Sequence, residues 1–315
     1  MLGRTADELY WMSRYIERAE NMARLLEVGY RIALLPRQGE GGESEWRSTL
    51  RSAGCEDTYL ARHGEIATKP VVDFMLFDRD NPSSVQSCLA TARHNARAQR
   101  TALTRDMWES LNSAWIEFNA IDPGQTSSDK LPALFDWIKG KSALFRGALL
   151  NTMLRNDRYY FSQLGTFVER ADNTARILDV KYYVLLPHKE MIGGNVDHAQ
   201  WAAILRSVSA HRSFRWVYKD GYSPWRIADY LILNRQLPRS LRSSYDEIVM
   251  ALERLGSFYG KPSPCLATAS QTMEMLSNRS IESVFQSGLH EFLVAVVSRN
   301  NQLGAEISSA YYFNI

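Results

Sequence analysis

Residues 15–30 read YIERAENMARLLEVGY and residues 167–182 read FVERADNTARILDVKY, so two distant stretches share one pattern. Nine positions are identical at a constant offset of 152 residues, and they include the Glu-Arg pairs Glu17-Arg18 and Glu169-Arg170. In each stretch the apolar residues recur at steps of three and four, which predicts an α-helix. The sequence therefore predicts two related helices that carry the same polar motif.

Two further similarities follow in the same order along the chain. WRSTLRS at 46–52 resembles WAAILRS at 201–207, at an offset of 155 residues. FMLFDRDNPSSV at 74–85 resembles YLILNRQLPRSL at 230–241, at an offset of 156 residues. Three ordered matches with small changes of offset indicate a duplicated unit about as long as one ordinary domain.

The predicted fold is all-α: a bundle of ten to fourteen helices, built from two tandem copies of one unit with pseudo-twofold symmetry, and no sheet. We assign residues 1–128 to the first copy, 129–156 to a connecting helix, 157–280 to the second copy and 281–315 to a C-terminal helix. Together they are expected to form one compact domain. Pro82 and Pro238 are each followed closely by a helical pattern, which predicts that they lie in first turns, where their missing N–H costs nothing.

Composition excludes several classes of protein. Of the 315 residues 45% are apolar, and 37 basic against 35 acidic residues leave a net charge of +2, so no basic block indicates nucleic-acid binding. Three scattered cysteines, without a secretory leader or an apolar run of membrane-spanning length, favour a reducing cytosol and no membrane insertion. No phosphate-binding loop or common catalytic motif is present, and no cofactor is expected in the chain itself.

The motif helices carry a polar stripe that both copies keep. On a helix that turns 100° per residue, Asn21 and Arg24 lie within about 40° of Glu17. The polar positions differ less between the copies than some apolar ones, since Met22 corresponds to Thr174. Isolated surface charges contribute little to stability and change freely, so something constrains this stripe. The candidate site residues are Glu17, Arg18, Glu20, Asn21, Arg24, Glu169, Arg170, Asp172, Asn173 and Arg176.

Two main interpretations of the stripe stay open. In the first it is a buried ion-pair network between the copies, with Glu17 facing Arg176 and Glu169 facing Arg24. In the second it is a central site for a ligand with both charges, such as an amino acid or a peptide end. A metal site built from carboxylates alone is a third and weaker interpretation, because neither motif contains the Glu-x-x-His of di-iron bundles.

Other candidate residues have less support. His94, Asn95 and Arg97 lie in RHNARAQR, a stretch with helical spacing, and His211 and His290 are isolated histidines. A single histidine on a helix is more often a structural residue than a base. No residue next to Cys55, Cys88 or Cys265 would activate a thiol, so nucleophilic catalysis is not expected.

The opening stretch MLGRTADELYWMSRYIERAENMARLL resembles the Alpha-E family, bacterial all-helical proteins named for a Glu-Arg motif. The stretch GTFVERADNTARILD, the paired LRS segments and the NPSS and LPRS joints extend the resemblance over nearly the whole chain. The resemblance implies gene neighbours: a circularly permuted ATP-grasp ligase and a transglutaminase-like cysteine peptidase. It assigns a role to no single residue.

These considerations lead to three hypotheses of function. The first is an accessory subunit of an ATP-grasp-type ligase in an amide-forming or peptide-tailoring system, in which the ligase holds ATP and magnesium. The second is a stand-alone enzyme or binder of an amino acid or peptide, with Glu17 or Glu169 as acid or base and Arg24 or Arg176 on a carboxylate. The third is a structural homodimer.

Overall fold

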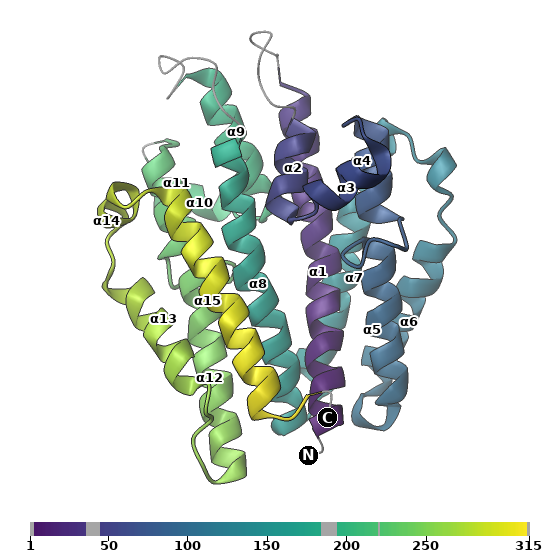
Figure 1. Cartoon of the computed structure of the whole chain (residues 1–315), viewed down its shortest axis with the longest axis vertical. Helices are drawn as coiled ribbons and strands as arrows, with labels where there is room; N and C mark the ends of the chain where they lie inside the picture. Colours follow the sequence, from purple (N-terminus) through teal and green to yellow (C-terminus); the bar gives the residue numbers. More distant parts are fainter. Residues whose placement is uncertain (1–2, 36–44, 184–193, 220, 314–315) are drawn as a thin grey trace.

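The computed structural model describes residues 3–35, 45–183, 194–219 and 221–313 and shows an all-helical protein (Figure 1). Within these ranges there are fifteen α-helices and no strand. The expected count of ten to fourteen helices was therefore slightly too low. Three helices have only six to eight residues, too few for a helical period to be read from sequence.

The longer helices of the first half surround its motif helix and include the connecting segment. They are α1 (Gly3–Ala33), α2 (Glu45–Ala53), α4 (Thr68–Leu76), α5 (Val85–Ala98), α6 (Arg105–Asn119) and α7 (Leu131–Thr152). The longer helices of the remainder are α8 (Asp157–Tyr183), α9 (Asn195–Ser207), α11 (Pro224–Ile232), α12 (Leu241–Tyr259), α13 (Leu266–Asn278) and α15 (Leu289–Ala310). The short helices are α3 (Glu56–His63), α10 (His211–Val217) and α14 (Ile281–Gln286).

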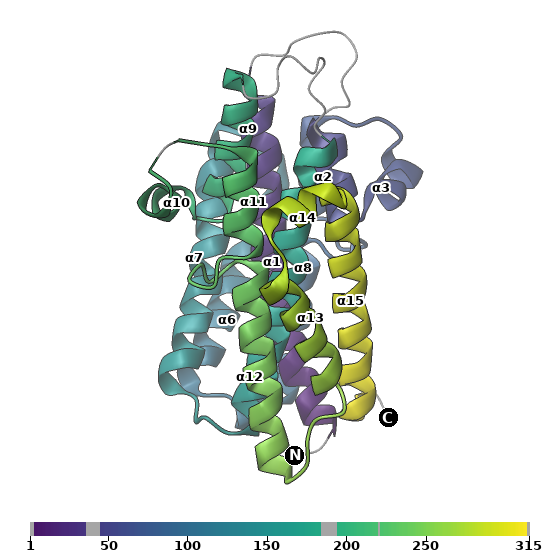
Figure 2. The same cartoon turned by 90° about the vertical axis from the view of Figure 1, so that its left-hand side faces the viewer.

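Helices α1 and α8 lie side by side at the centre of the molecule and run in the same direction (Figures 1 and 2). Helices α5 and α7 pack on α1, while α12 and α15 pack on α8. Both α2 and α9 contact both central helices. Each central helix is thus enclosed by neighbours that occur in the same order along the chain.

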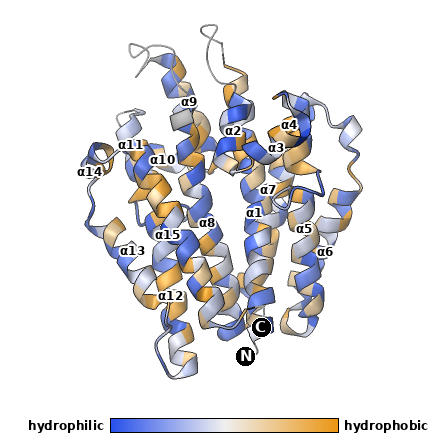
Figure 3. Cartoon of the chain, viewed as in Figure 1, coloured by the Kyte–Doolittle hydropathy of each residue, from blue (hydrophilic) through white to orange (hydrophobic). Residues whose placement is uncertain are grey.

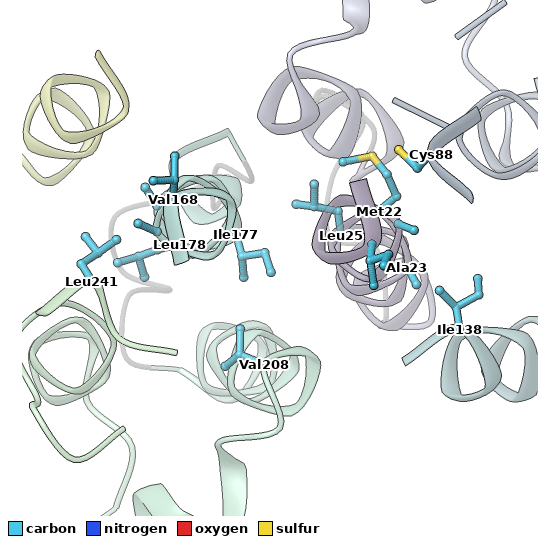
Figure 4. Close-up of a cluster of buried hydrophobic side chains, with 14 of the residues drawn as sticks. Met22, Ala23, Leu25, Cys88, Ile138, Val168, Ile177, Leu178, Val208 and Leu241 are labelled. Atoms are coloured by element: carbon cyan, nitrogen blue, oxygen red, sulfur yellow. The ribbon is translucent and has the colours of Figure 1, made fainter. Parts of the chain in front are cut away.

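Apolar side chains join the central pair to the outer helices. Figure 4 shows Met22 of α1 next to Cys88 of α5, and Leu241 of α12 directed toward α8. All three side chains are buried. Hydrophilic residues also occur on the central helices, as the colouring of Figure 3 shows for α8. The interior therefore contains polar groups that need partners of their own.

Serine caps, not prolines, begin α5 and α12. The Ser84 hydroxyl accepts the backbone N–H of Ser87 at 3.1 Å, and the Ser240 hydroxyl accepts that of Ser243 at 2.9 Å. The first-turn positions expected for Pro82 and Pro238 are wrong, because each proline lies two residues before its cap. A serine oxygen satisfies a free N–H of the first turn, which a proline cannot do.

The C-terminal segment contains two helices where one was expected. Helix α14 ends at Gln286 and α15 begins at Leu289. Gly288 between them has a φ of 87°, in the left-handed region that a residue with a side chain rarely adopts. The chain turns at this glycine and returns along α8 as α15.

Candidate functional site

Glu17 lies at the contact between the two central helices and binds three guanidinium groups. Its carboxylate accepts two hydrogen bonds from Arg170 of α8, at 3.0 and 3.1 Å. Arg146 of α7 donates to it at 2.8 Å, and Arg239, before α12, donates at 3.0 Å. The side chain is 1% exposed, so these groups replace water around the charge.

Glu20, one turn further along α1, shares two of these partners. Arg239 and Arg146 both donate to its carboxylate as well as to that of Glu17. Arg24 contributes two more bonds from within α1, at 2.9 and 2.5 Å. Four arginines from four segments therefore converge on two adjacent carboxylates.

Glu169 repeats the arrangement of Glu17 with the helices exchanged. Arg18 of α1 binds it at 2.6 and 2.9 Å, and Arg14 adds a bond at 2.8 Å. Each motif glutamate is thus bound by the arginine of the other motif. The guanidinium groups of Arg14 and Arg18 also lie over aromatic rings of α1, at 4.7 Å from the ring centroid of Trp11 and 5.5 Å from that of Tyr15.

Arg24 and Arg176 have partners other than the expected ones. Arg24 bonds Glu20 and the carbonyl of Ser207 at the end of α9, and Arg176 bonds Asp172 at 2.6 Å and the carbonyl of Ser52 at 3.2 Å. The expected pairs Glu17–Arg176 and Glu169–Arg24 are therefore wrong. In parallel helices, equivalent residues lie at the same height, and Arg176 lies roughly 10 Å beyond the level of Glu17.

The two motif asparagines are buried beside the charges. Asn21 donates to the backbone carbonyl of Glu169 at 3.4 Å, and its own carbonyl oxygen has no partner among the described residues. Neither amide atom of Asn173 has a partner within those residues. Asn173 of α8 thus lacks the hydrogen bond that Asn21 of α1 makes.

Electrostatics keep the carboxylates ionised despite their burial. Burial alone would raise the pKa of Glu17, but Arg170, Arg239 and Arg146 outweigh it and lower the pKa to about 2. Burial and two arginines act in the same way on Glu169, whose pKa is also about 2. The pKa of Glu20 lies well below its ordinary value, because three arginines overcome its burial.

The network around Glu17 and Glu20 contains more positive than negative charge. Its four arginines exceed its two carboxylates. The pKa of Arg239 is lowered to about 9, mainly by burial and further by the positive charges of Arg24 and Arg170. The two glutamates raise this pKa but do not offset the lowering. Arg239 stays protonated at neutral pH, but its charged form is disfavoured by its cationic neighbours.

This geometry limits the chemistry of the motif. A carboxylate with a pKa of about 2 holds no proton to donate at neutral pH and is a weak base. All carboxylate oxygens of Glu17, Glu20 and Glu169 accept bonds from arginines. Over the described ranges no group of three His, Cys, Asp or Glu side chains could hold a metal ion. The arrangement suits an ion-pair network or the binding of an anion.

The structure separates the weaker candidates from this network. His94 and Arg97 are exposed on α5, and Asn95 is half-buried there. His290 bonds Asp179 at 2.7 Å, and His211 bonds Tyr222 at 2.5 Å. The repeat comparison missed Arg14, Arg146 and Arg239. In the sequence similarity Arg14 matches Thr166 and Arg239 matches Ser83, so neither stands out as a repeated arginine. Arg146 lies in the connecting helix, and only the geometry identifies these three residues.

The Glu-Arg pairing connects this geometry to a known family. The Alpha-E profile, described as a predicted alpha-helical domain with a conserved ER motif, matches residues 1–312. The chain belongs to the Alpha-E family. In this Alpha-E protein two Glu-Arg pairs, Glu17-Arg18 and Glu169-Arg170, form the contact between α1 and α8.

Two mycobacterial proteins are similar to part of this Alpha-E chain. Uncharacterized protein Mb2597 of Mycobacterium bovis and uncharacterized protein MT2643 of Mycobacterium tuberculosis are each 36% identical to it over 118 residues. The match covers 33% of this chain and 13% of each relative, so most of each relative lies outside it. No solved structure matches the chain. Within the described ranges no helix has the length and apolar character needed to cross a membrane.

Proposed function

We propose that this Alpha-E protein is a non-catalytic helical partner of an ATP-grasp-type ligase in an amide-forming or peptide-tailoring system. The proposal rests on one observation: the carboxylates of Glu17 and Glu169 are buried, ionised and already bound by arginines of the opposite helix. Such groups fix the register of two helices better than they transfer protons. The motif then holds the fold together, and function resides on the outer surface.

We infer that the two halves are diverged copies of one unit. The sequence repeats support this, as do the exchanged pairs Glu17–Arg170 and Glu169–Arg18. Helices α5 and α7 around α1 have counterparts in α12 and α15 around α8. A duplicated scaffold of this kind offers two related outer faces that are free to diverge.

The ligase and a transglutaminase-like peptidase are the partners implied by the resemblance to Alpha-E proteins. The mycobacterial relatives support a role beside other protein modules, since the matched region is a small part of each polypeptide. A cytosolic location is part of this proposal. The chemistry would take place on the ligase, with this protein bound next to its active site.

Co-elution tests the proposal directly. The purified chain and an ATP-grasp-type ligase of the class that the resemblance implies are mixed at micromolar concentration and analysed by size-exclusion chromatography with light scattering. We expect one complex and faster product formation by the ligase. Separate elution of the two proteins at this concentration would refute the partnership. A dimer of this chain alone would instead support the structural homodimer.

The excess of arginine favours one alternative, a binder of amino-acid or peptide carboxylates. Four guanidiniums for two carboxylates leave positive charge that an anion could neutralise, and the Arg146 side chain is 22% exposed. Calorimetry with amino acids and short peptides tests it. Heat that disappears in Arg146→Gln would support this alternative, and no heat from any of them would exclude the binding of these ligands.

A further inference from the structure

Helix α10 is a short, firmly held projection from the second half. Its Phe214 is fully buried and stacks on Tyr218 and Tyr222, with ring centroids 4.9 and 5.8 Å apart. The ring of Tyr230 meets it edge-on at 5.6 Å. Figure 2 shows α10 at the left-hand edge, outside the main bundle. The helix therefore presents its outer face on a preorganised base.

The outer face of α10 combines an exposed tryptophan with cations. Trp216 is 72% exposed and Val217 is 47% exposed, while Arg212 and Arg215 beside them are also exposed. Leaving a large aromatic side chain in water forgoes the free energy of its burial. Most of the Trp216 side chain thus lies outside the packing of the described residues.

The basic side chains around Trp216 have no acidic partner among the described residues. Residues 206–219 contain no Asp or Glu, and the next acidic residue, Asp220, lies outside the described residues. The exposed side chains of Arg206, Arg212, Arg215 and Lys219 make no ion pair or hydrogen bond with the described residues, whereas Arg62 and Arg235 elsewhere on the surface pair with aspartates. Burial, with Arg206 and Arg215, lowers the pKa of His211, which is consistent with a positive local potential.

The corresponding helix of the first half lacks these features. Helix α3 follows α2 as α10 follows α9, but it begins with Glu56 and Asp57 and contains no tryptophan. The fold can therefore be built without a basic aromatic helix at this place. The surface formed by Arg206, Arg212, Arg215, Trp216, Val217 and Lys219 is here named the α10 patch. Arg206 matches Arg51 of the first half, but Arg51 pairs with Glu56.

We propose that the α10 patch is the surface that docks on an acidic face of the partner protein, with Trp216 entering an apolar pocket of that partner. Tryptophan and arginine are the residues most enriched at the energetic centre of protein interfaces. Two exposed apolar side chains are too few for stable membrane attachment, and one exposed ring on this patch offers no series of stacking platforms for nucleic acid. The inference rests on the proposed function, because it assigns a docking surface for that same partner.

The test compares two charge-reversal variants in binding to the ATP-grasp-type ligase of the proposed function. One variant carries Arg212→Glu, Arg215→Glu and Lys219→Glu. The control carries the same three changes of charge at exposed positions elsewhere, Arg79→Glu, Arg158→Glu and Arg254→Glu. We expect the first variant to bind more than tenfold more weakly and the control to bind like the wild type. Trp216→Ala is expected to lose more than tenfold at both low and high salt, because its contribution is apolar.

The outcomes distinguish the two proposals. Equal binding of all variants would overturn the docking surface and leave the partnership intact. If the ligase does not bind the wild type, the partnership fails, and the patch is then tested with a synthetic glutamate-rich helical peptide that contains leucine. Peptide binding that is lost in the α10 variant but not in the control would support the inference. No binding of the peptide, or patch-dependent binding only to oligouridine or to phosphatidylglycerol vesicles, would overturn it.

Discussion

Glu17 and Arg170 face each other across the central helix pair, with two hydrogen bonds of 3.0 and 3.1 Å between the carboxylate and the guanidinium. The same contact with the helices exchanged joins Glu169 to Arg18. Because the two helices are parallel, Glu17 and Glu169 lie at the same height. The arginine that reaches Glu17 is therefore Arg170, which directly follows Glu169. This explains why glutamate and arginine stand next to each other in the motif.

Replacing Glu17 tests the cost of uncompensated buried arginine. Glu17→Gln would leave Arg170, Arg146 and Arg239 with less negative charge, so we expect a loss of about 3–5 kcal/mol in the free energy of unfolding and a fall of roughly 5–8 °C in Tm. Glu169→Gln should cost less, because the side chains of Arg14 and Arg18 are 11% and 21% exposed. Thermal melts measure both, with the exposed Glu253→Gln as a control expected near wild type. An equal loss for both glutamates would contradict this reading of the network.

The low pKa values of Glu17 and Glu169 predict a loss of stability in acid. Both pKa values are about 2 in the folded protein against an ordinary 4.5, so the unfolded state binds more protons as pH falls below about 5. Their contribution is constant above pH 5 and is lost progressively between about pH 5 and pH 2. Urea unfolding at pH 7, 5, 4 and 3 measures it. We expect the free energy of unfolding to fall less steeply with decreasing pH in Glu169→Gln than in the wild type. Parallel curves for the variant and the wild type would refute the low pKa of Glu169.

Two glycines in helices predict opposite effects of an added methyl group. A Cβ at Gly165 would clash with the backbone carbonyl of Tyr10, because α1 and α8 approach closely there. Gly165→Ala should therefore destabilise the protein by about 1–3 kcal/mol or more. Gly147 in α7 has nothing within 4 Å of such a Cβ, so Gly147→Ala should stabilise it by roughly 0.5–1 kcal/mol. Urea unfolding checks both, and a tolerated Gly165→Ala would contradict the close helix contact.

Burial predicts that the cysteine thiols react slowly in the native protein. Burial raises the pKa of Cys55 and of Cys88 to about 12, and it also raises the pKa of Cys265. Since the thiolate is the reactive form, we expect slow reaction with a disulfide reagent at pH 8 and fast reaction of three thiols in denaturant. The absorbance of the released thiolate measures both rates. If one thiol per chain reacted fast in the native protein, that thiol would be accessible and the prediction would be wrong.

The central helices could be predicted from sequence because their signal is local and occurs twice. Period and repetition identified the stretches around Glu17 and Glu169, and α1 and α8 include them. The polar stripe was also recognisable, since Glu17, Glu20 and Asn21 resist the drift expected of solvated positions and are buried. Short helices such as α10 and α14 have too few residues for a period, so the helix count was low.

The partners of the stripe could not be predicted, because they depend on the direction in which the helices pack. The sequence does not show that α1 and α8 pack in parallel. The expected Glu17–Arg176 pair would require a different register between these two helices. Arg146 and Arg239 come from segments far from the motif, and the similar stretch 74–85 has Ser83 where 230–241 has Arg239. Only the folded chain brings them to Glu17 and Glu20.

The excess of arginine predicts that the two members of one ion pair are not equivalent. Glu20→Gln would leave Arg24, Arg146 and Arg239 near a single remaining glutamate, whereas Arg24→Gln leaves Glu20 still bound by Arg146 and Arg239. Arg24 is also one of the cations that lower the pKa of Arg239, so its removal relieves repulsion. We therefore expect Glu20→Gln to cost about 3–5 kcal/mol and Arg24→Gln clearly less. Urea unfolding of both variants at pH 7 measures the difference. An Arg24→Gln variant as unstable as Glu20→Gln would mean that the network is balanced in charge, and the case for an anion at this site would be lost with it.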